Sequence, residues 1–150
     1  MEQKGLRGSS AARIDDKGRL KVPTVFRSVI QDQHGPDVFV TSLTGKSVLI
    51  YPMPAWLEVE RRLNAMPGTH PSKLKFLNRV NYWGQTGELD SQGRVLIPAQ
   101  LRQSASIEGD VRVFGNITHL EVWNEDVIAR KLDEDPWSDE DGLKLAEHGV

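Results

Sequence analysis

Residues 14–27, IDDKGRLKVPTVFR, align without gaps on residues 89–102, LDSQGRVLIPAQLR, at an offset of 75 positions. Five positions are identical: the Asp, the Gly, the first Arg, the Pro and the final Arg. Four apolar positions exchange only among Ile, Leu, Val and Phe. A duplication of this kind predicts two copies of one supersecondary unit within the chain.

Each copy reads as the same series of short elements. An Asp-x-x-Gly turn, in which Gly18 or Gly93 supplies a positive φ, separates two strands. Pro23 and Pro98 then end the second strand and suit the start of a short helix. In the first copy we expect strands over 19–22, 38–41 and 47–51 and a helix over 24–29. In the second copy we expect strands over 94–97, 111–115 and 119–123 and a helix over 99–105.

One copy, of roughly 45 residues, is too small to bury a core alone. Two copies can pair their strands about a pseudo-two-fold axis, so we expect one compact β-barrel in a mainly β protein with short helices, of the α+β class. Amphipathic spacing predicts helices over 54–63 and 72–83, and Asn124 and Ser138 are suitable N-caps for two more. The expected organisation is a first repeat, linking helices, a second repeat and a C-terminal helix with an acidic tail, over 8–53, 54–83, 84–126 and 127–150.

Composition narrows the classes of protein that this chain can be. Cysteine is absent and the four histidines are scattered, so disulfides, thiolate chemistry and a metal or other cofactor are not expected. No apolar run approaches the ~18 residues of a membrane span, and no signal peptide is visible at the N-terminus. We therefore expect a soluble, intracellular protein.

Charge is distributed unevenly along the chain. Residues 1–80 carry 13 Lys/Arg and 7 Asp/Glu, whereas residues 81–150 carry 6 and 14. A basic first half suggests a polyanionic partner, although charge also varies along chains by chance. Much of the negative excess falls within residues 133–141, which we interpret as a solvated tail.

The repeated stretches closely resemble the doubled Asp-x-x-x-Arg motif of the bacterial MraZ family. The resemblance extends to residues 6–8, which lie seven positions before the first Asp where the family has Phe-Arg-Gly, and to 51–56 and 120–123. It covers about residues 6–132. Membership would imply two tandem swapped-hairpin repeats of the SpoVT-AbrB type.

The resemblance also implies a function. Members of the MraZ family are sequence-specific transcriptional regulators that bind short direct repeats in the promoter of the division and cell-wall gene cluster. They form ring-shaped homo-oligomers that present many copies of one DNA-binding face. The resemblance thus implies double-stranded DNA and other copies of the chain as partners, no membrane and no small-molecule substrate, and a cytoplasmic, nucleoid-associated location.

The first repeat has the residues that such a function needs. It carries five cations within 15 residues, a density suited to phosphate neutralisation and to an Arg contact with guanine edges. In the second repeat only Arg94 and Arg102 remain of these five, so we expect the first repeat to contact DNA and the second to be mainly architectural. The candidate DNA-binding residues are Arg7, Arg13, Lys17, Arg19 and Lys21; the candidate structural residues of the motif are Asp15, Gly18, Asp90, Gly93 and Arg94.

Several of these residues admit a second interpretation. Asp15 and Asp90 can serve the turn or take part in the DNA contact, and Arg19 can contact DNA or form a fixed ion pair with Asp15. Arg27 and Arg102 read as structural residues or as part of a subunit boundary. Trp56, Trp83 and Trp123 read as core or interface residues.

Two other classes of function stay open. A symmetric pair of carboxylates, Asp15 and Asp90, can form a catalytic centre if the two lie together in a cleft, although an enzyme is not expected. Alternatively, the acidic segment 133–141 suggests an antitoxin-like module that binds a basic protein.

Overall fold

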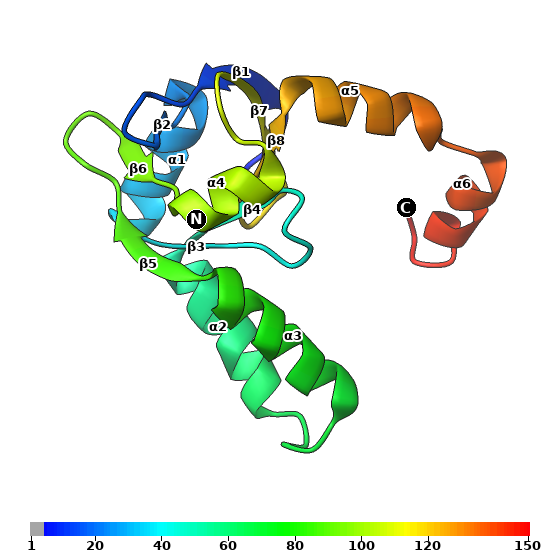
Figure 1. The fold of residues 1–150 in the computed structure, drawn as a ribbon. Coiled ribbons are helices and arrows are strands. Elements are labelled where there is room, and N and C mark those ends of the chain that lie inside the picture. The colour runs from blue at the N-terminus through cyan, green and yellow to red at the C-terminus, as the bar shows by residue number, and fades with distance from the viewer. Residues whose placement is uncertain (1–4) are drawn as a thin grey trace.

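The computed structural model describes residues 5–150, and the two repeats contain equivalent elements in the same order (Figure 1). The elements of the first repeat are β1 (Ser9–Arg13), β2 (Arg19–Lys21), α1 (Thr24–His34), β3 (Asp37–Thr41) and β4 (Val48–Pro52). Those of the second are β5 (Gln85–Glu88), β6 (Arg94–Leu96), α4 (Ala99–Ala105), β7 (Asp110–Gly115) and β8 (Leu120–Asn124). Between and after them lie α2 (Met53–Asn64), α3 (Pro71–Trp83), α5 (Glu125–Glu134) and α6 (Asp139–Ala146).

The strands form two antiparallel sheets that both repeats share. A six-stranded sheet has the order β1-β7-β8-β4-β3-β5, and β2 pairs with β6 in a separate two-stranded sheet. Each of the pairs β1–β7, β4–β8, β3–β5 and β2–β6 joins one repeat to the other. The α+β class expected from the sequence is confirmed, and neither repeat has a sheet of its own. The expectation of a mainly β protein with short helices was wrong, because α1, α2 and α3 have 11, 12 and 13 residues whereas the strands have three to six.

Alternation of side chains builds the core on one face of the large sheet. In β4 every second residue is buried, and in β7 and β8 this alternation holds until the last residue, as strands with one covered face require. On β2 and β6 the central residues Leu20 and Val95 point into the same core. The first helix adds Phe26 and Ile30, one helical turn apart, so its buried stripe continues past the predicted end at residue 29. That prediction was too short because the polar run 31–33 concealed the continuation.

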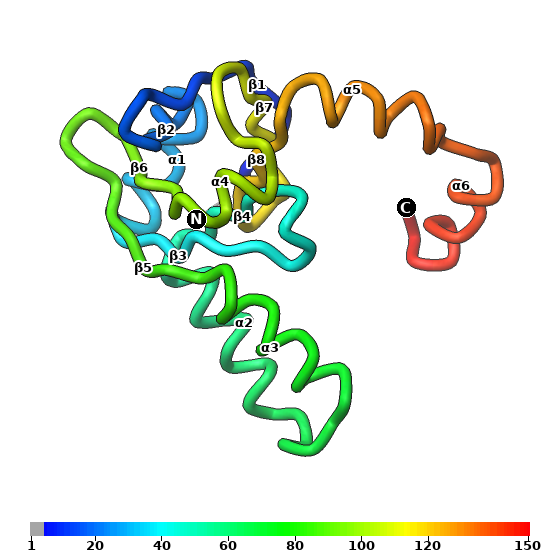
Figure 2. Tube along the Cα trace, viewed as in Figure 1, coloured from blue at the N-terminus to red at the C-terminus, as the bar shows by residue number. Residues whose placement is uncertain are grey.

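The helices α2 and α3 form a hairpin that projects from the sheets, and the tube in Figure 2 follows the same path. A second apolar cluster fastens it: Trp56 lies 4.6 Å from Phe39 and 5.0 Å from Tyr51, measured between ring centroids. Val80 of α3 completes the cluster. Leu74, an apolar residue of the predicted helix over 72–83, is exposed instead. The sequence periodicity alone therefore does not identify the buried face of α3.

The C-terminal segment is more ordered than its composition suggests. Residues 133–141, expected to be a solvated tail, contain the end of α5 and the start of α6, although all of them are exposed. Ser138 caps α6 as predicted, because its Oγ accepts the Asp141 N–H while the Asp141 carboxylate accepts the Ser138 N–H. Within residues 5–150, no helix is long and apolar enough to cross a membrane.

Candidate nucleic-acid interface

The turn between β1 and β2 is organised around the carboxylate of Asp15. Its Oδ1 accepts the backbone N–H groups of Lys17 and Arg19 at 2.9 and 2.8 Å, and its Oδ2 accepts Arg19 Nε at 2.8 Å. Gly18 donates its N–H to the Asp15 carbonyl and has a φ of +82°, a conformation that favours glycine. One side chain thus closes the turn and orients the Arg19 guanidinium.

The turn between β5 and β6 repeats this arrangement. Asp90 accepts the backbone N–H groups of Gln92 and Arg94 and the Nε of Arg94, at distances of 2.9, 2.8 and 2.8 Å. The backbone N–H of the Arg, followed by the other N–H donors and the guanidinium charge, holds the pKa of each Asp below its usual 3.8 although partial desolvation opposes the shift. Both carboxylates are therefore ionised at neutral pH, and each forms an ion pair with its Arg.

The ion pair leaves part of each guanidinium available. In the described chain, Arg19 and Arg94 use only Nε to bind carboxylate, and their terminal nitrogens have no acceptor. The two interpretations of Arg19, a fixed ion pair and a DNA contact, are thus compatible. An Arg that is oriented in advance loses less conformational freedom when it binds an anion.

The strands β2 and β6 form a two-stranded ribbon that gathers three cations. Lys21 lies opposite Arg94 and Arg19 lies opposite Leu96, while the intervening pair, Leu20 and Val95, is buried. Because side chains alternate along strands, Arg19, Lys21, Arg94 and Leu96 share the outer face. We call these four residues the ribbon face. Arg94, which we expected to be mainly structural, thus lies beside the cations of the first repeat.

Two cations face each other on this ribbon. Lys21 and Arg94 are cross-strand partners, an arrangement that destabilises a sheet when no anion lies between them. No carboxylate within residues 5–150 forms an ion pair with Lys21. Asp15 and Asp90 already pair with the two Arg residues, so Lys21 is the cation of the ribbon face that forms no ion pair among the described residues.

The helices of the two repeats support each other's turns. Arg27 of α1 donates from Nη2 to the Ser91 carbonyl at 2.9 Å and packs against Gly93, and Arg102 of α4 packs against Gly18. The Val22 N–H binds the Gly93 carbonyl at 2.9 Å, and the Ile97 N–H binds the Gly18 carbonyl at 3.0 Å. Arg27 and Arg102 thus each contact the turn of the other repeat, which agrees with the structural interpretation of these residues.

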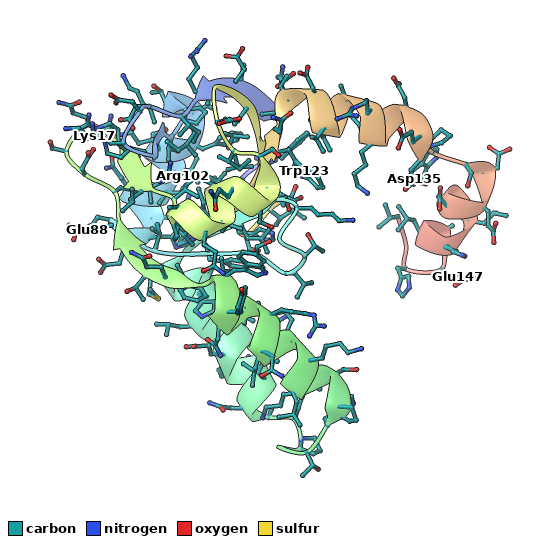
Figure 3. The ribbon with its side chains drawn as sticks, viewed as in Figure 1. Lys17, Glu88, Arg102, Trp123, Asp135 and Glu147 are labelled. Atoms are coloured by element: carbon teal, nitrogen blue, oxygen red, sulfur yellow. The ribbon has the colours of Figure 1, made fainter. Side chains whose placement is uncertain are left out.

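The remaining predicted residues do not all lie on the ribbon. Lys17, labelled in Figure 3, is exposed on the turn that leads into β2. Arg13 ends β1 in the other sheet, where it forms a 3.0 Å ion pair with Asp110. Arg7 lines a cavity of 620 Å³ beside His34 and Arg62, between the end of α1 and α2. The structure therefore joins Lys17, Arg19 and Lys21 with Arg94. Arg13 lies directly before the Ile14–Leu20 bridge that connects the end of β1 to β2, and Arg7 lies at the cavity.

Arg94 could have been found from the sequence. The repeat alignment equates Arg94 with Arg19, and an antiparallel pairing of the two equivalent strands puts equivalent positions on one face. The missing information was that the two repeats pair through these strands.

The structure removes the geometry that the enzyme alternative needed. Asp15 and Asp90 each bind donors of their own turn, and no hydrogen bond joins them among the described residues. Both pKa values are lowered, whereas a shared catalytic pair would have one raised. Within residues 5–150, no group of three or more His, Asp or Glu side chains is arranged to hold a metal ion.

The fold and the site together define a double-repeat protein whose halves meet at a cationic β-ribbon. The chain belongs to the MraZ family. The family model, described as an MraZ protein and as antitoxin-like, matches residues 6–79 and 85–135. The resemblance found in the sequence is therefore confirmed over both repeats.

Curated relatives match nearly the whole chain. The transcriptional regulator MraZ of Acidobacterium capsulatum is 46% identical over 145 residues, which are 97% of this chain and 99% of that protein. The protein of the same name in Koribacter versatilis is 43% identical, over 97% of this chain and 99% of its own length. That of Syntrophobacter fumaroxidans is 36% identical over 88% and 89%.

Proposed function

We propose that this protein is a sequence-specific DNA-binding transcriptional regulator and that the ribbon face is its DNA contact. The observation that carries this proposal is the grouping of Arg19, Lys21 and Arg94 on one exposed face of a two-stranded ribbon. The major groove of B-DNA admits such a ribbon, and an Arg fork matches the O6 and N7 acceptors of guanine. The curated relatives carry the name transcriptional regulator, which agrees with this assignment.

Each candidate residue receives a role in this proposal. Arg19 and Arg94 read bases with the terminal nitrogens that Asp15 and Asp90 leave available, and Lys17 and Lys21 contact phosphates. Gly18 and Gly93 keep the two turns tight. Arg13 is paired with Asp110 and Arg7 lines the cavity, and neither belongs to the two strands of the ribbon, so we assign them at most flanking phosphate contacts.

We further propose that the repeats are swapped-hairpin units that close into a pseudo-two-fold barrel. The pairing of β1 with β7, β3 with β5 and β2 with β6 supports this arrangement, because each pair exchanges strands between repeats. The proposed boundaries are 8–53 and 84–126 for the repeats, 54–83 for the linking helices and 127–150 for the C-terminal part.

The proposal also includes the assembly. We propose a ring-shaped homo-oligomer that binds short direct repeats in the promoter of the division and cell-wall gene cluster. Three or four cations per chain give modest affinity at physiological salt. Several chains on adjacent repeats would gain roughly 10²–10⁴ in affinity through effective concentration. A cytoplasmic, nucleoid-associated location follows from that activity.

Fluorescence anisotropy with a duplex from upstream of the protein's own gene tests the proposal. The native chain, Arg19→Ala and Arg94→Ala are compared on that duplex and on a scrambled duplex across a salt series. We expect a preference for the native duplex that each substitution lowers roughly ten- to a hundredfold, because a bidentate base contact is lost. Lys46→Ala, which removes an exposed cation outside the ribbon face, should retain the preference.

Binding without preference at any salt would contradict the proposal and favour the protein-binding alternative. Retained preference in both Arg variants would show that the ribbon face is not the reading surface. The subunit mass of every variant, measured in parallel, separates a lost contact from a lost assembly.

A further inference from the structure

The C-terminal residues 125–150, which we call the acidic arm, leave the sheets after the first turns of α5. There Glu125 forms a 3.0 Å ion pair with Arg112 of β7, and Lys131 lies over the Trp123 ring. The first turns of α5 pack through the buried Ile128, but from residue 129 onward every residue except Gly142 is exposed. Figure 1 shows α6 standing apart from the sheets, and Asp135 and Glu147 lie on this arm in Figure 3. Beyond the first turns of α5, the arm is thus a helical extension whose side chains are almost all exposed.

Large apolar side chains are exposed along this arm. Trp137 is 69% exposed, Leu143 is 71% exposed and Leu132 is 62% exposed. Trp137 lies beside Gly142 of α6, where an added Cβ would be 3.8 Å from its ring. Large apolar side chains that are exposed among charged residues in this way are typical of an interaction surface.

The order of α6 also requires an explanation. A helix of eight residues is marginal in water, and most helical stability in proteins comes from packing of an apolar face. The capping box at Ser138 and Asp141 starts the helix, but no described residue covers Leu143. A docking partner would supply the missing contact.

The charge of the arm indicates the kind of partner. Residues 125–150 contain nine Asp/Glu and three Lys/Arg, a net charge of −6. The α2–α3 hairpin, residues 53–83, contains two Asp/Glu and five Lys/Arg, a net charge of +3. The arm and the hairpin of this chain are therefore complementary in charge.

The hairpin also exposes apolar groups beside its cations. Lys75, Arg79 and Tyr82 follow the i, i+4, i+7 spacing of one helical face, and Tyr82 is 65% exposed. Leu57 on α2 and Leu74 on α3 are also exposed. In the part of the chain that the structure describes, neither Lys75 nor Arg79 forms an ion pair. This surface can receive both the carboxylates and the apolar side chains of the arm.

We propose that the acidic arm of one copy docks on the α2–α3 hairpin of the next copy. The inference rests on the oligomer of the proposed function and names the contact that builds it. The arm and the hairpin leave the sheets in different directions (Figure 1), and they are different surfaces. A contact between them is head-to-tail, and repetition of such a contact closes a ring when the rotation fits.

Sedimentation velocity of the full-length chain tests this contact. Two double variants are compared with the native chain: Trp137→Ala/Leu143→Ala and Lys75→Glu/Arg79→Glu. The protein concentration at which the oligomer dissociates should be at least tenfold higher for each variant than for the native chain. Val25→Ala, which truncates a 62% exposed apolar residue on α1, is the matched control and should keep the native mass. Native mass in both double variants, or a monomeric native chain, would overturn the proposal.

A charge exchange keeps the test independent of folding defects. Glu134→Lys/Glu140→Lys reverses charge on the arm and should also dissociate. Combined in one chain with Lys75→Glu/Arg79→Glu, it should restore the native mass, because both partners then carry reversed charge. Loss of assembly in the combined variant, with unchanged circular dichroism, would overturn the assignment of these charges to one contact.

The same proteins distinguish failure of this contact from failure of the proposed function. If the arm variants keep the native mass while Arg19→Ala loses its preference for the promoter duplex, the docking is wrong and the regulator stands. If the arm variants dissociate while the native chain shows no preference for that duplex, the docking stands and the regulator is wrong.

Discussion

At the scale of single residues, Gly18 and Gly93 carry two constraints at once. Their φ angles are +82° and +76°, and a Cβ at these positions would lie 2.4 Å from Arg102 and 2.5 Å from Arg27, respectively. The guanidinium groups are flexible and can move away from a Cβ. The positive φ would remain strained for any residue other than glycine. Each glycine thus allows the turn to form with its hydrogen bonds to the Asp carboxylate. It also leaves room for the Arg side chain of the other repeat that packs against the turn.

The substitution Gly18→Ala should lower the free energy of unfolding by about 1–3 kcal/mol, the usual strain of a non-glycine residue held in such a conformation. Urea unfolding followed by circular dichroism measures this change. Gly68→Ala is the matched control, since Gly68 has open space around it and no positive φ, and it should be neutral or slightly stabilising. Equal effects of the two substitutions would contradict the account of the turn.

At the scale of elements, the attachment of the α2–α3 hairpin depends on one aromatic cluster. Trp56 is 5% exposed and contacts Phe39 of β3, Tyr51 of β4 and Phe76 of α3. These contacts join both helices of the hairpin to two adjacent strands of the large sheet. The direction in which the hairpin projects is therefore set by this cluster.

Trp56→Ala should lower the free energy of unfolding by about 3–5 kcal/mol, because it leaves a cavity between the hairpin and the sheet. Hydrogen exchange should show α2 and α3 losing protection before the strands do. The control Glu60→Ala, at an exposed position of the same helix, should change stability by no more than about 0.5 kcal/mol. Uniform loss of protection in hairpin and strands would mean that the two unfold as one unit.

The sequence predicted the elements well where periodicity is strong and less well where the repeats interact. The turns at Asp15 and Asp90, the strands and the capped α6 follow from local chemistry, because the residues that specify them are adjacent in the chain. The exposed position of Leu74 and the grouping of Arg94 with Lys21 depend on contacts between distant segments. A single sequence does not specify such contacts.

At the scale of the whole molecule, His119 makes stability sensitive to mild acid. Its ring stacks on Tyr51 with centroids 4.2 Å apart, and burial lowers its pKa below the usual 6.5 although the Glu121 carboxylate opposes the shift. Below pH 6.5 the unfolded chain then binds more protons than the folded chain. The stabilising contribution is complete above pH 6.5 and is lost as the pH falls through the lowered pKa.

We therefore expect the thermal midpoint of the native chain to fall between pH 7.5 and pH 5.5, and to fall less in His119→Phe, which keeps a ring against Tyr51. Differential scanning calorimetry at several pH values measures both slopes. Identical slopes in the two proteins would assign the pH dependence to other groups. Further loss below about pH 3.8 belongs to Asp15 and Asp90, whose lowered pKa values stabilise the fold only while they are ionised.

The exchange of strands between the repeats has a consequence for how the chain is made. β1 ends at Arg13, and its partner β7 begins at Asp110, almost 100 residues later. At the usual 5–20 residues per second of synthesis, the N-terminal strand waits roughly 5–20 s on the ribosome before its neighbour exists. During that interval its backbone N–H and C=O groups are unpaired and available to other chains. The more slowly a ribosome extends this chain, the longer the edge of its N-terminal strand therefore stays unpaired.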